Sequence, residues 1–278
     1  SVTTGIRNVI VGGLAGDAFT DADFNTAVGH GALSTDTLGS KSVAIGNGAL
    51  GTQNYTTATD TFNTAVGTNA GTAVTTGAFN TLIGGLAGDA LTDGFDNVAV
   101  GKGALSTEDR GAKNTAIGHE ALSNQNAGTG NTFNTAVGAS AGSSVTTGTN
   151  NTLIGYDAGG SMTTGNANTA VGLSALGNAT VTGADNTAIG VGAGYSLTSG
   201  SNNLLLGHDS GRTGSPGGST GTASNQINLG DENISECNIQ VDWTVASDQR
   251  DKTDFTALDL GLDFVKALAP VTYKWDKR

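Results

Sequence analysis

Apolar residues recur along the chain in a five-residue block that ends in glycine. The block reads Asn-Thr-Ala-Val-Gly at 63–67, 134–138 and 168–172. Twelve copies begin at residues 8, 25, 42, 63, 80, 97, 114, 134, 151, 168, 186 and 203, most of them 17 residues apart. A fixed period of this size predicts a solenoid, in which each coil contacts only its neighbours.

The block itself predicts a short strand that ends in a turn, because it is rich in Thr and Val and is closed by Gly. Counting its first residue as position 0, position 3 is Val, Ile or Leu and position 4 is Gly in every copy. Representative residues at these two positions are Val66, Gly67, Ile83, Gly84, Val137 and Gly138.

Positions 2 and 3 are both apolar, although neighbouring side chains of a strand point to opposite faces. One face can fill the inside of the coil, whereas the other needs a second apolar surface. We expect two further copies of the chain to provide that surface in a homotrimer.

Position 0 is Asn in eleven of the twelve copies, Asn63, Asn80 and Asn134 among them. Identical amides stacked in register can form a hydrogen-bonded ladder along a rod on the order of 60 Å long. The pattern predicts an all-β protein, a parallel β-solenoid or β-roll of about twelve coils in a homotrimeric rod. A small α+β segment is expected to follow at the C-terminus.

Two steps between blocks are longer than the rest, 21 residues after Ser42 and 20 after Asn114. The extra residues, around Gln53–Thr61 and Asn124–Thr132, are expected to bulge from one side of the rod. Loops on a rigid scaffold often bind partners. A solvated excursion without a partner is an equally good interpretation.

Composition excludes several classes of function. The net charge of −12 argues against nucleic acid, whose phosphates require clustered Lys and Arg. A single cysteine, Cys237, excludes an internal disulfide framework. No run of 18 apolar residues occurs, so no membrane insertion is expected.

Three sets of residues resemble binding motifs, and none predicts a cofactor or a metal. Residues 46–51 match a dinucleotide-binding glycine pattern in letters, but no helix is expected to follow them. His30, His119 and His208 each follow a position-4 glycine and have no second ligand at metal spacing. Asp17, Asp21 and Asp23 lack the spacing of a calcium loop, which favours a solvated face.

The composition changes after the last block. Residues 1–211 are predicted to be the solenoid shaft, and 212–224, rich in Gly, Ser and Thr, a linker. Residues 225–246 are predicted to form a β transition segment, because apolar residues alternate from Ile239 to Val245. Since Ser1–Gly5 repeats the letters of Ser144–Gly148 and the chain stops early in its last segment, we expect a fragment of a longer protein.

The last segment, 247–278, has its own pattern. It opens with Ser-Asp-Gln-Arg-Asp-Lys at 247–252, and Leu258, Leu262, Val265 and Leu268 follow at helical spacing. A strand is predicted at Val271–Trp275. With Cys237–Trp243 before it, this order of motifs resembles the opening of the intramolecular chaperone domain of phage tail fibres and tailspikes. The repeats in turn resemble the β-roll head of trimeric autotransporter adhesins, whose coils are shorter.

The resemblance to the chaperone implies a domain that trimerises, helps the preceding β-structure to fold, and then cuts itself off. The implied cut lies between Ser247 and Asp248, with Ser247 as nucleophile and Lys252 assisting. A serine hydroxyl needs a nearby base, and a desolvated lysine can serve. Spacing alone favours a polar loop in which Ser247 caps a turn and Lys252 is solvated, and the surrounding motifs reverse that preference.

Together these features predict the shaft of a homotrimeric viral tail fibre, a virion component exposed to the outside. Its expected partners are further copies of itself, other virion tail proteins, and a host cell-surface receptor such as a glycan. A bacterial trimeric surface adhesin or extracellular filament is the first alternative. A polysaccharide-degrading tailspike is the second, and it would need a catalytic domain elsewhere.

Overall fold

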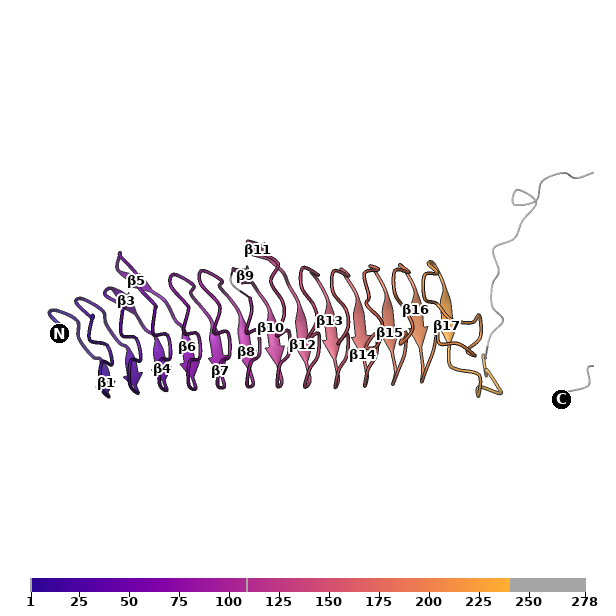
Figure 1. Ribbon diagram of the computed structural model, residues 1–278, viewed down its shortest axis with the longest axis horizontal. Coiled ribbons are helices and arrows are strands. Elements are labelled where there is room, and N and C mark those ends of the chain that lie inside the picture. Colours follow the sequence, from indigo (N-terminus) through magenta and orange to yellow (C-terminus); the bar gives the residue numbers. More distant parts are fainter. Residues whose placement is uncertain (1, 109, 241–278) are drawn as a thin grey trace, which may run out of the picture. The chain divides into compact units, whose positions relative to one another are not determined.

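The computed structural model describes residues 2–108 and 110–240. The chain divides into two units, Ser1–Ser235 and Glu236–Arg278. The first unit is a parallel β-solenoid whose coils stack along one axis (Figure 1), and the described residues contain no helix. The predicted all-β, parallel β-solenoid fold is confirmed for the first unit, with about twelve coils and a period of roughly 17 residues.

One strand from each coil joins a single parallel sheet of thirteen strands along one side of the first unit. Twelve of them are the predicted blocks, and the thirteenth is a degenerate copy at Ile227–Leu229. The strands are β1 (Val9–Val11), β2 (Thr26–Val28), β4 (Val43–Ile45), β6 (Thr64–Val66), β7 (Thr81–Ile83), β8 (Val98–Val100), β10 (Thr115–Ile117), β12 (Thr135–Val137), β13 (Thr152–Ile154), β14 (Thr169–Val171), β15 (Thr187–Ile189), β16 (Leu204–Leu206) and β17 (Ile227–Leu229).

Each strand pairs with the next coil in strict register. Thr64 lies opposite Thr81, Ala65 opposite Leu82, and Val66 opposite Ile83. A shift of one residue would turn the buried side chains of a strand outward, so the pairing is fixed wherever one face is buried. The repeat therefore places equal positions of successive coils in columns along the rod.

The side chains at position 2 fill the interior of the rod, and a large side chain there is matched by a small residue at position 8 of the same coil. Where position 2 is the large Leu82 or Leu153, position 8 of the same coil is Gly88 or Gly159. A Cβ atom at either glycine would lie 2.7 Å from a Cδ2 atom of that leucine. Because protein interiors are close-packed, a bulky side chain at one position requires a small one at the other.

The glycine at position 4 is required by two constraints. Gly67, Gly84 and Gly138 have φ angles of 142°, 132° and 140°, which L side chains rarely adopt. A Cβ atom on Gly67 would also lie 2.5 Å from the carbonyl oxygen of Gly84 in the next coil. The coils can stack this closely only because the position has no side chain.

The position-0 asparagines form the predicted ladder, but most of its bonds go to the backbone. Asn63 Oδ1 accepts the backbone N–H of Asn80 at 2.9 Å, and Asn63 Nδ2 donates to the carbonyl of Gly77 at 2.7 Å. The same two bonds recur at Asn80 and Asn134. Amide-to-amide bonds occur in only some of the described coils, for example Asn151 Nδ2 to Asn134 Oδ1 at 3.2 Å.

The segment 212–224 differs from the linker that its composition predicts. It closes the coil between β16 and β17, and Ser215 and Thr220 are buried. The Thr220 hydroxyl donates to the carbonyl of Gly211 at 3.1 Å, and the Ser215 hydroxyl donates to that of Arg212 at 2.8 Å. Small polar residues suit a tight hydrogen-bonded turn as well as a flexible chain, so composition alone does not separate the two.

We expect Asn80→Ala to lower the free energy of unfolding by roughly 2–4 kcal/mol, because two buried backbone groups lose their partner. Urea denaturation followed by circular dichroism measures the change. Asn47→Ala is the matched control, since Asn47 is exposed and Ala139 occupies the same repeat position; it should change stability by less than about 0.5 kcal/mol. Equal effects of the two substitutions would contradict a structural role for the ladder.

Candidate functional site

The outward face of the long sheet carries an apolar stripe formed by the position-3 side chains. Ile83 is 39% exposed, and Val66 and Val137 are half-buried, whereas the position-2 side chains beside them are fully buried. The predicted opposition of positions 2 and 3 is therefore confirmed. The stripe runs through all thirteen strands, from Val11 to Leu229.

The stripe widens in three coils near the C-terminal end of the solenoid. Position 5 of three successive coils carries Tyr156, Leu173 and Val191, which are 61%, 51% and 47% exposed. In the sequence they follow the stripe residues Ile154, Val171 and Ile189 by two positions. Exposed apolar residues that line up along a rod are typical of a surface that another protein covers.

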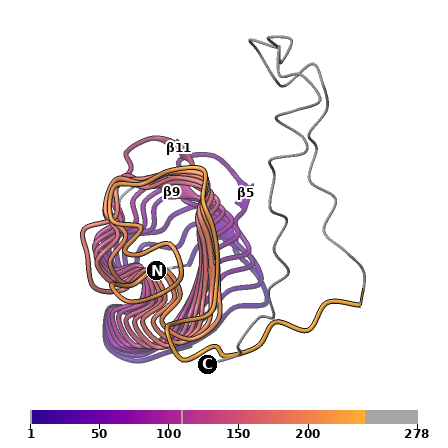
Figure 2. The same ribbon diagram turned by 90° about the vertical axis from the view of Figure 1, so that its right-hand side faces the viewer.

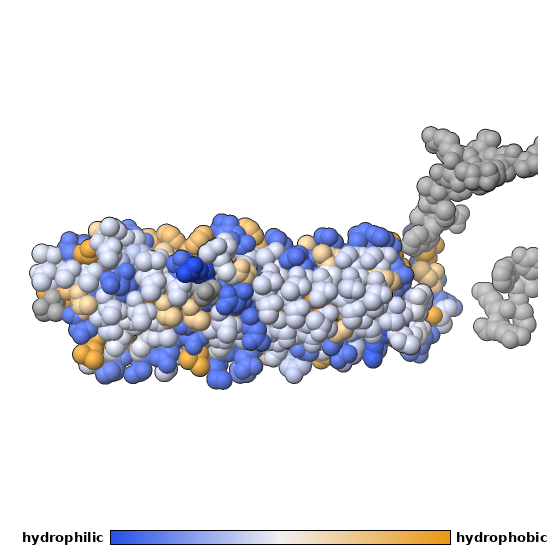
Figure 3. All heavy atoms as spheres, turned by 45° about the horizontal axis from the view of Figure 1, so that its top comes forward, coloured by the Kyte–Doolittle hydropathy of each residue, from blue (hydrophilic) through white to orange (hydrophobic). Residues whose placement is uncertain are grey.

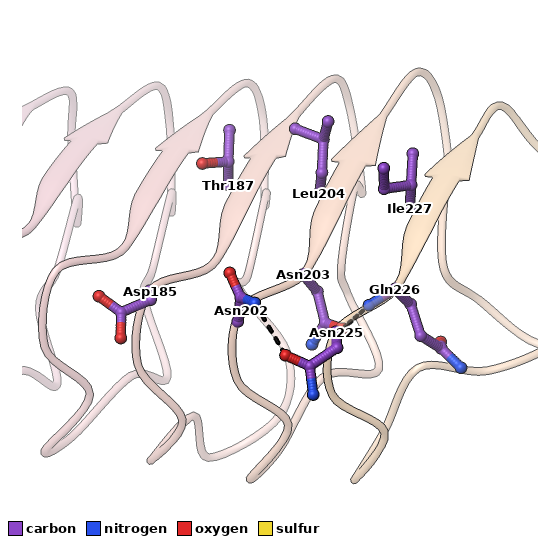
Figure 4. Close-up of a pocket in the computed structure, with 8 residues that line it drawn as sticks. All are labelled: Asp185, Thr187, Asn202, Asn203, Leu204, Asn225, Gln226 and Ile227. Carbon is purple, nitrogen blue, oxygen red and sulfur yellow. Dashed lines mark hydrogen bonds between the residues drawn. The ribbon is translucent and has the colours of Figure 1, made fainter. Parts of the chain in front are cut away.

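Elsewhere the surface is mixed. On the face shown in Figure 3, strongly apolar residues lie in separate groups among residues of near-neutral hydropathy. Near the C-terminal end, a groove of about 320 Å³ is lined mainly by amide and aliphatic side chains (Figure 4). In it, Asn202 Nδ2 donates to Asn225 Oδ1 at 2.8 Å, and the N–H of Gln226 donates to Asn203 Oδ1 at 3.0 Å.

The two longer coils make excursions that project beyond the other coils in the view along the axis (Figure 2). In the first, β5 (Thr59–Asp60) pairs with β3 (Gly39–Ser40). In the second, β11 (Gly130–Asn131) pairs with β9 (Gly111–Ala112). The excursions have exposed tips, but Gln53 and Thr61 at the ends of the first are fully buried.

A buried acid and a buried glutamine hold the first excursion. Asp36 and Gln53 are fully buried, and Gln53 Nε2 donates to Asp36 Oδ2 at 2.6 Å. Asp36 Oδ1 accepts the N–H groups of Gly39 at 3.0 Å and Tyr55 at 3.2 Å. Gln53 Oε1 accepts Asn63 Nδ2 at 2.9 Å, which ties the set to the asparagine ladder.

The second excursion repeats this arrangement with a glutamate. Gln125 Nε2 donates to Glu108 Oε2 at 2.9 Å, and the N–H of Gly111 donates to Glu108 Oε1 at 2.7 Å. Gln125 Oε1 accepts Asn134 Nδ2 at 3.0 Å. A buried carboxylate is tolerated only when it is hydrogen-bonded in this way.

Sequence reasoning missed these four residues, although a signal was present. They occupy position 11, which is an apolar, buried residue in other coils, such as Phe19, Val74 and Leu91. At position 11, a polar residue replaces the apolar one in two successive coils, and the extra residues of the longer coil follow the second of them. This pattern marks the coils whose interior needs extra hydrogen-bond partners.

The histidines and aspartates from the sequence have separate surroundings. The three histidines belong to different coils, and the described residues hold no group of three His, Cys, Asp or Glu that could bind a metal. His208 Nδ1 lies 3.1 Å from Asp231 Oδ2, and that carboxylate, helped by Asp209, raises the pKa of His208 above its usual value of 6.5. Asp21 accepts the Thr4 hydroxyl, and Asp23 accepts the N–H of Ile6.

Residues 46–51 form the turn after β4, and Gly46 and Gly48 are ordinary repeat positions there. Among the described residues, no helix is long and apolar enough to cross a membrane.

The residues expected to carry chemistry, Ser247, Asp248 and Lys252, lie outside the described residues, so their geometry stays a prediction. Residues 247–278 match the family model described as the chaperone of endosialidase. The matched stretch begins at Ser247, directly at the expected cleavage site. Neither the search of curated proteins nor the search of solved structures found a match to the chain. Statements about the solenoid therefore rest on its structure alone, and statements about residues 247–278 rest on the family model.

We expect Asp36→Leu to loosen the first excursion, because the N–H groups of Gly39 and Tyr55 lose their acceptor. Hydrogen exchange of peptides from 36–61, measured by mass spectrometry, should accelerate by about ten-fold or more. Peptides from 108–132 are the control within the same molecule, since the Glu108 set is intact there. Unchanged exchange in both regions would show that the excursion is held by other contacts.

Proposed function

We propose that this chain is the shaft of a homotrimeric virion tail fibre or tailspike that attaches the particle to a host surface. In this proposal, residues 247–278 begin an intramolecular chaperone that assembles the trimer and is then removed. The observation that carries the proposal is the chaperone match directly behind a β-solenoid whose outer face bears an apolar stripe along its length.

The stripe supports association with further copies of the chain. An apolar column that runs the length of the rod needs a partner of equal length and equal repeat. A second and third copy meet both conditions, because every coil would face the same chemistry. Closed cyclic symmetry would then bury the stripe near a common axis.

The repeat also explains why a chaperone would be needed. Successive strands have nearly the same sequence, so chains that are slipped by one coil would lose little contact. Register is weakly specified in such repeats. A C-terminal domain that joins the three chains before the shafts pair would remove the slipped assemblies, and its removal afterwards would make the assembly irreversible.

Within the matched segment we assign Ser247 as the nucleophile, Lys252 as the assisting base, and the peptide bond between Ser247 and Asp248 as the cleavage site. The hydroxyl oxygen of Ser247 would attack the carbonyl carbon of the Ser247–Asp248 bond in a neighbouring copy, since attack on its own carbonyl would close a four-membered ring. An unprotonated Lys252 amine would take up the hydroxyl proton and pass it to the departing amine of Asp248, and water would then hydrolyse the ester on Ser247. Solvated lysine is protonated at neutral pH, so the reaction would wait until assembly has desolvated it.

Cleavage is tested by the intact mass of the product expressed from the complete gene. We expect the wild type to end at Ser247, Ser247→Ala to stay uncut, and Lys252→Ala to be cut more slowly. Ser235→Ala, a serine outside the matched segment, should be cut like the wild type. An uncut wild type would contradict the assignment of Ser247 and Lys252.

Trimer formation is tested by light scattering after size exclusion. We expect three copies of the chain in the wild type, and single copies in an Ile154→Asp, Ile189→Asp variant, because buried unpaired carboxylates oppose association. Both side chains point outward, so the circular dichroism of the variant should match the wild type. Ala167→Asp is the control, since Asp96 and Asp185 occupy the same repeat position. A trimeric double variant would show that the stripe is not the contact.

A further inference from the structure

A second column of side chains runs beside the sheet, formed by the residue directly before position 0 of each coil. All thirteen of these residues have left-handed backbone angles, with φ between 51° and 65°. They are Arg7, Phe24, Lys41, Phe62, Phe79, Asp96, Lys113, Phe133, Asn150, Ala167, Asp185, Asn202 and Asn225. We call this set the left-handed column.

Four phenylalanines in this column are doubly unfavourable for stability. Phe24, Phe62, Phe79 and Phe133 are 45%, 50%, 54% and 48% exposed. Left-handed angles favour Gly, Asn and Asp and disfavour bulky residues. Asn occupies the same position at Asn150, Asn202 and Asn225, so the fold itself does not require phenylalanine there. Strained residues that the fold does not need point to a binding role.

Cations hold several of these rings in place. The Arg7 guanidinium lies 5.0 Å from the centre of the Phe24 ring, and the Lys41 ammonium 5.1 Å from that of Phe62. Lys113 lies 5.5 Å from the centre of the Phe133 ring. The rings of Phe62 and Phe79 stack with centroids 5.9 Å apart. Such contacts orient aromatic rings at an exposed surface.

Two hollows open beside the column. The first, of about 490 Å³, is lined by Thr76, Ala78, Phe79, Asp93, Phe95 and Asp96. Its size is in the range of small-ligand sites, about 300–1,000 Å³. It combines two partly exposed aromatic rings with two carboxylates and a hydroxyl. The nearby Arg110 Nε lies 3.7 Å from Asp93 Oδ1.

The second hollow, of about 470 Å³, lies three coils earlier and has one aromatic ring, three carboxylates and a lysine in its lining. Phe24, Asp21 and Asp23 line it, together with Lys41 and Asp60. Phe24 and Phe79 hold the same repeat position, but Asp21 and Asp23 precede Phe24 in its own coil, whereas Asp93 and Asp96 belong to the coil after Phe79. The rod therefore presents an aromatic face with adjacent carboxylates twice along one line.

We propose that these hollows bind uncharged, hydroxyl-rich glycans. A sugar ring offers an apolar C–H face that packs on an exposed phenylalanine, and hydroxyl groups that donate to carboxylates. The carboxylates of Asp93 and Asp96 and the net charge of −12 oppose anionic sugars, which makes uncharged glycans the complementary class. The role of such binding in host attachment rests on the proposed function, whereas the binding itself does not.

The left-handed column does not fit the contact between copies of the chain. Its aromatic residues end at Phe133, and the later coils carry Asn, Ala and Asp. The position-3 stripe, by contrast, stays apolar to Leu229. A contact between identical rods would need the same chemistry along the full length, whereas a ligand site can be confined to some coils.

The test uses the full chain on an array of neutral hexose and N-acetylhexosamine oligosaccharides printed beside sialylated ones. We expect binding to at least one neutral glycan, and binding about ten-fold weaker for Phe79→Asn, since losing a central aromatic contact has an effect of that order. Ala167→Asn is the control, because it introduces the same residue, asparagine, at the same repeat position in a coil that lines neither hollow. It should bind like the wild type. Circular dichroism confirms folding of both variants.

Three results would overturn the proposal. They are an array without binding to neutral glycans, binding to sialylated glycans alone, and neutral binding that Phe79→Asn does not weaken. The mass by light scattering, measured for each protein, separates this proposal from the trimeric fibre. If the wild type is a single copy and binds neutral glycans through Phe79, the glycan site is supported and the trimer is contradicted. Loss of the trimer in Phe79→Asn would instead make the column a contact between copies.

Discussion

The structure depends on the direct stacking of one coil's backbone on the next. The glycine at position 4 leaves no room for a side chain between coils, and the asparagine at position 0 bonds to the backbone of its neighbours on the rod. Both contacts require each coil to return to the same place after every turn. Extra residues are therefore accommodated only where the chain can leave the stack. In the coils that begin at Ser42 and Asn114, the chain leaves the stack before Asn63 and before Asn134. There the displaced backbone is hydrogen-bonded by two buried pairs, Asp36 with Gln53 and Glu108 with Gln125.

Stacking also divides the repeat into positions with different freedom. Interior positions must conserve volume, as Leu82 with Gly88 and Leu153 with Gly159 show. Outward positions are free of that constraint, so the type of side chain there indicates the kind of partner that contacts it. Position 3 is uniform along the rod, which suits a partner with the same repeat. The left-handed column changes from aromatic and cationic residues to amides after Phe133, which suits a ligand bound at some coils and not at others.

The sequence alone predicts most of the solenoid because each coil obeys local rules. The period locates twelve of the thirteen strands of the long sheet, and the alternation of strand side chains separates Ala65 from Val66. The polar interior sets escaped, since Asp36 and Glu108 look like surface residues until the column around them is known to be apolar. The left-handed column escaped because a backbone angle is not visible in the letters, and phenylalanine is an improbable residue for it. The chemistry expected at Ser247 and Lys252 came from resemblance, and the family match covers the same stretch.

In a trimer, the repeat that makes stacking possible would also make chains slipped by one or more coils similar in energy to the correctly aligned ones. Only the irregular coils would distinguish the correct register from the slipped ones. The excursions lie four coils apart, so a slip of one, two or three coils would mismatch them, but a slip of four would bring the excursion at Thr59–Asp60 level with the one at Gly130–Asn131. The widened stripe at Tyr156, Leu173 and Val191 occurs once among the described coils and breaks that remaining ambiguity. It lies near the C-terminal end of the solenoid, in coils that would pair early if a chaperone at the C-terminus joined the chains. Pairing from that end would meet the least repetitive surface before the most repetitive one.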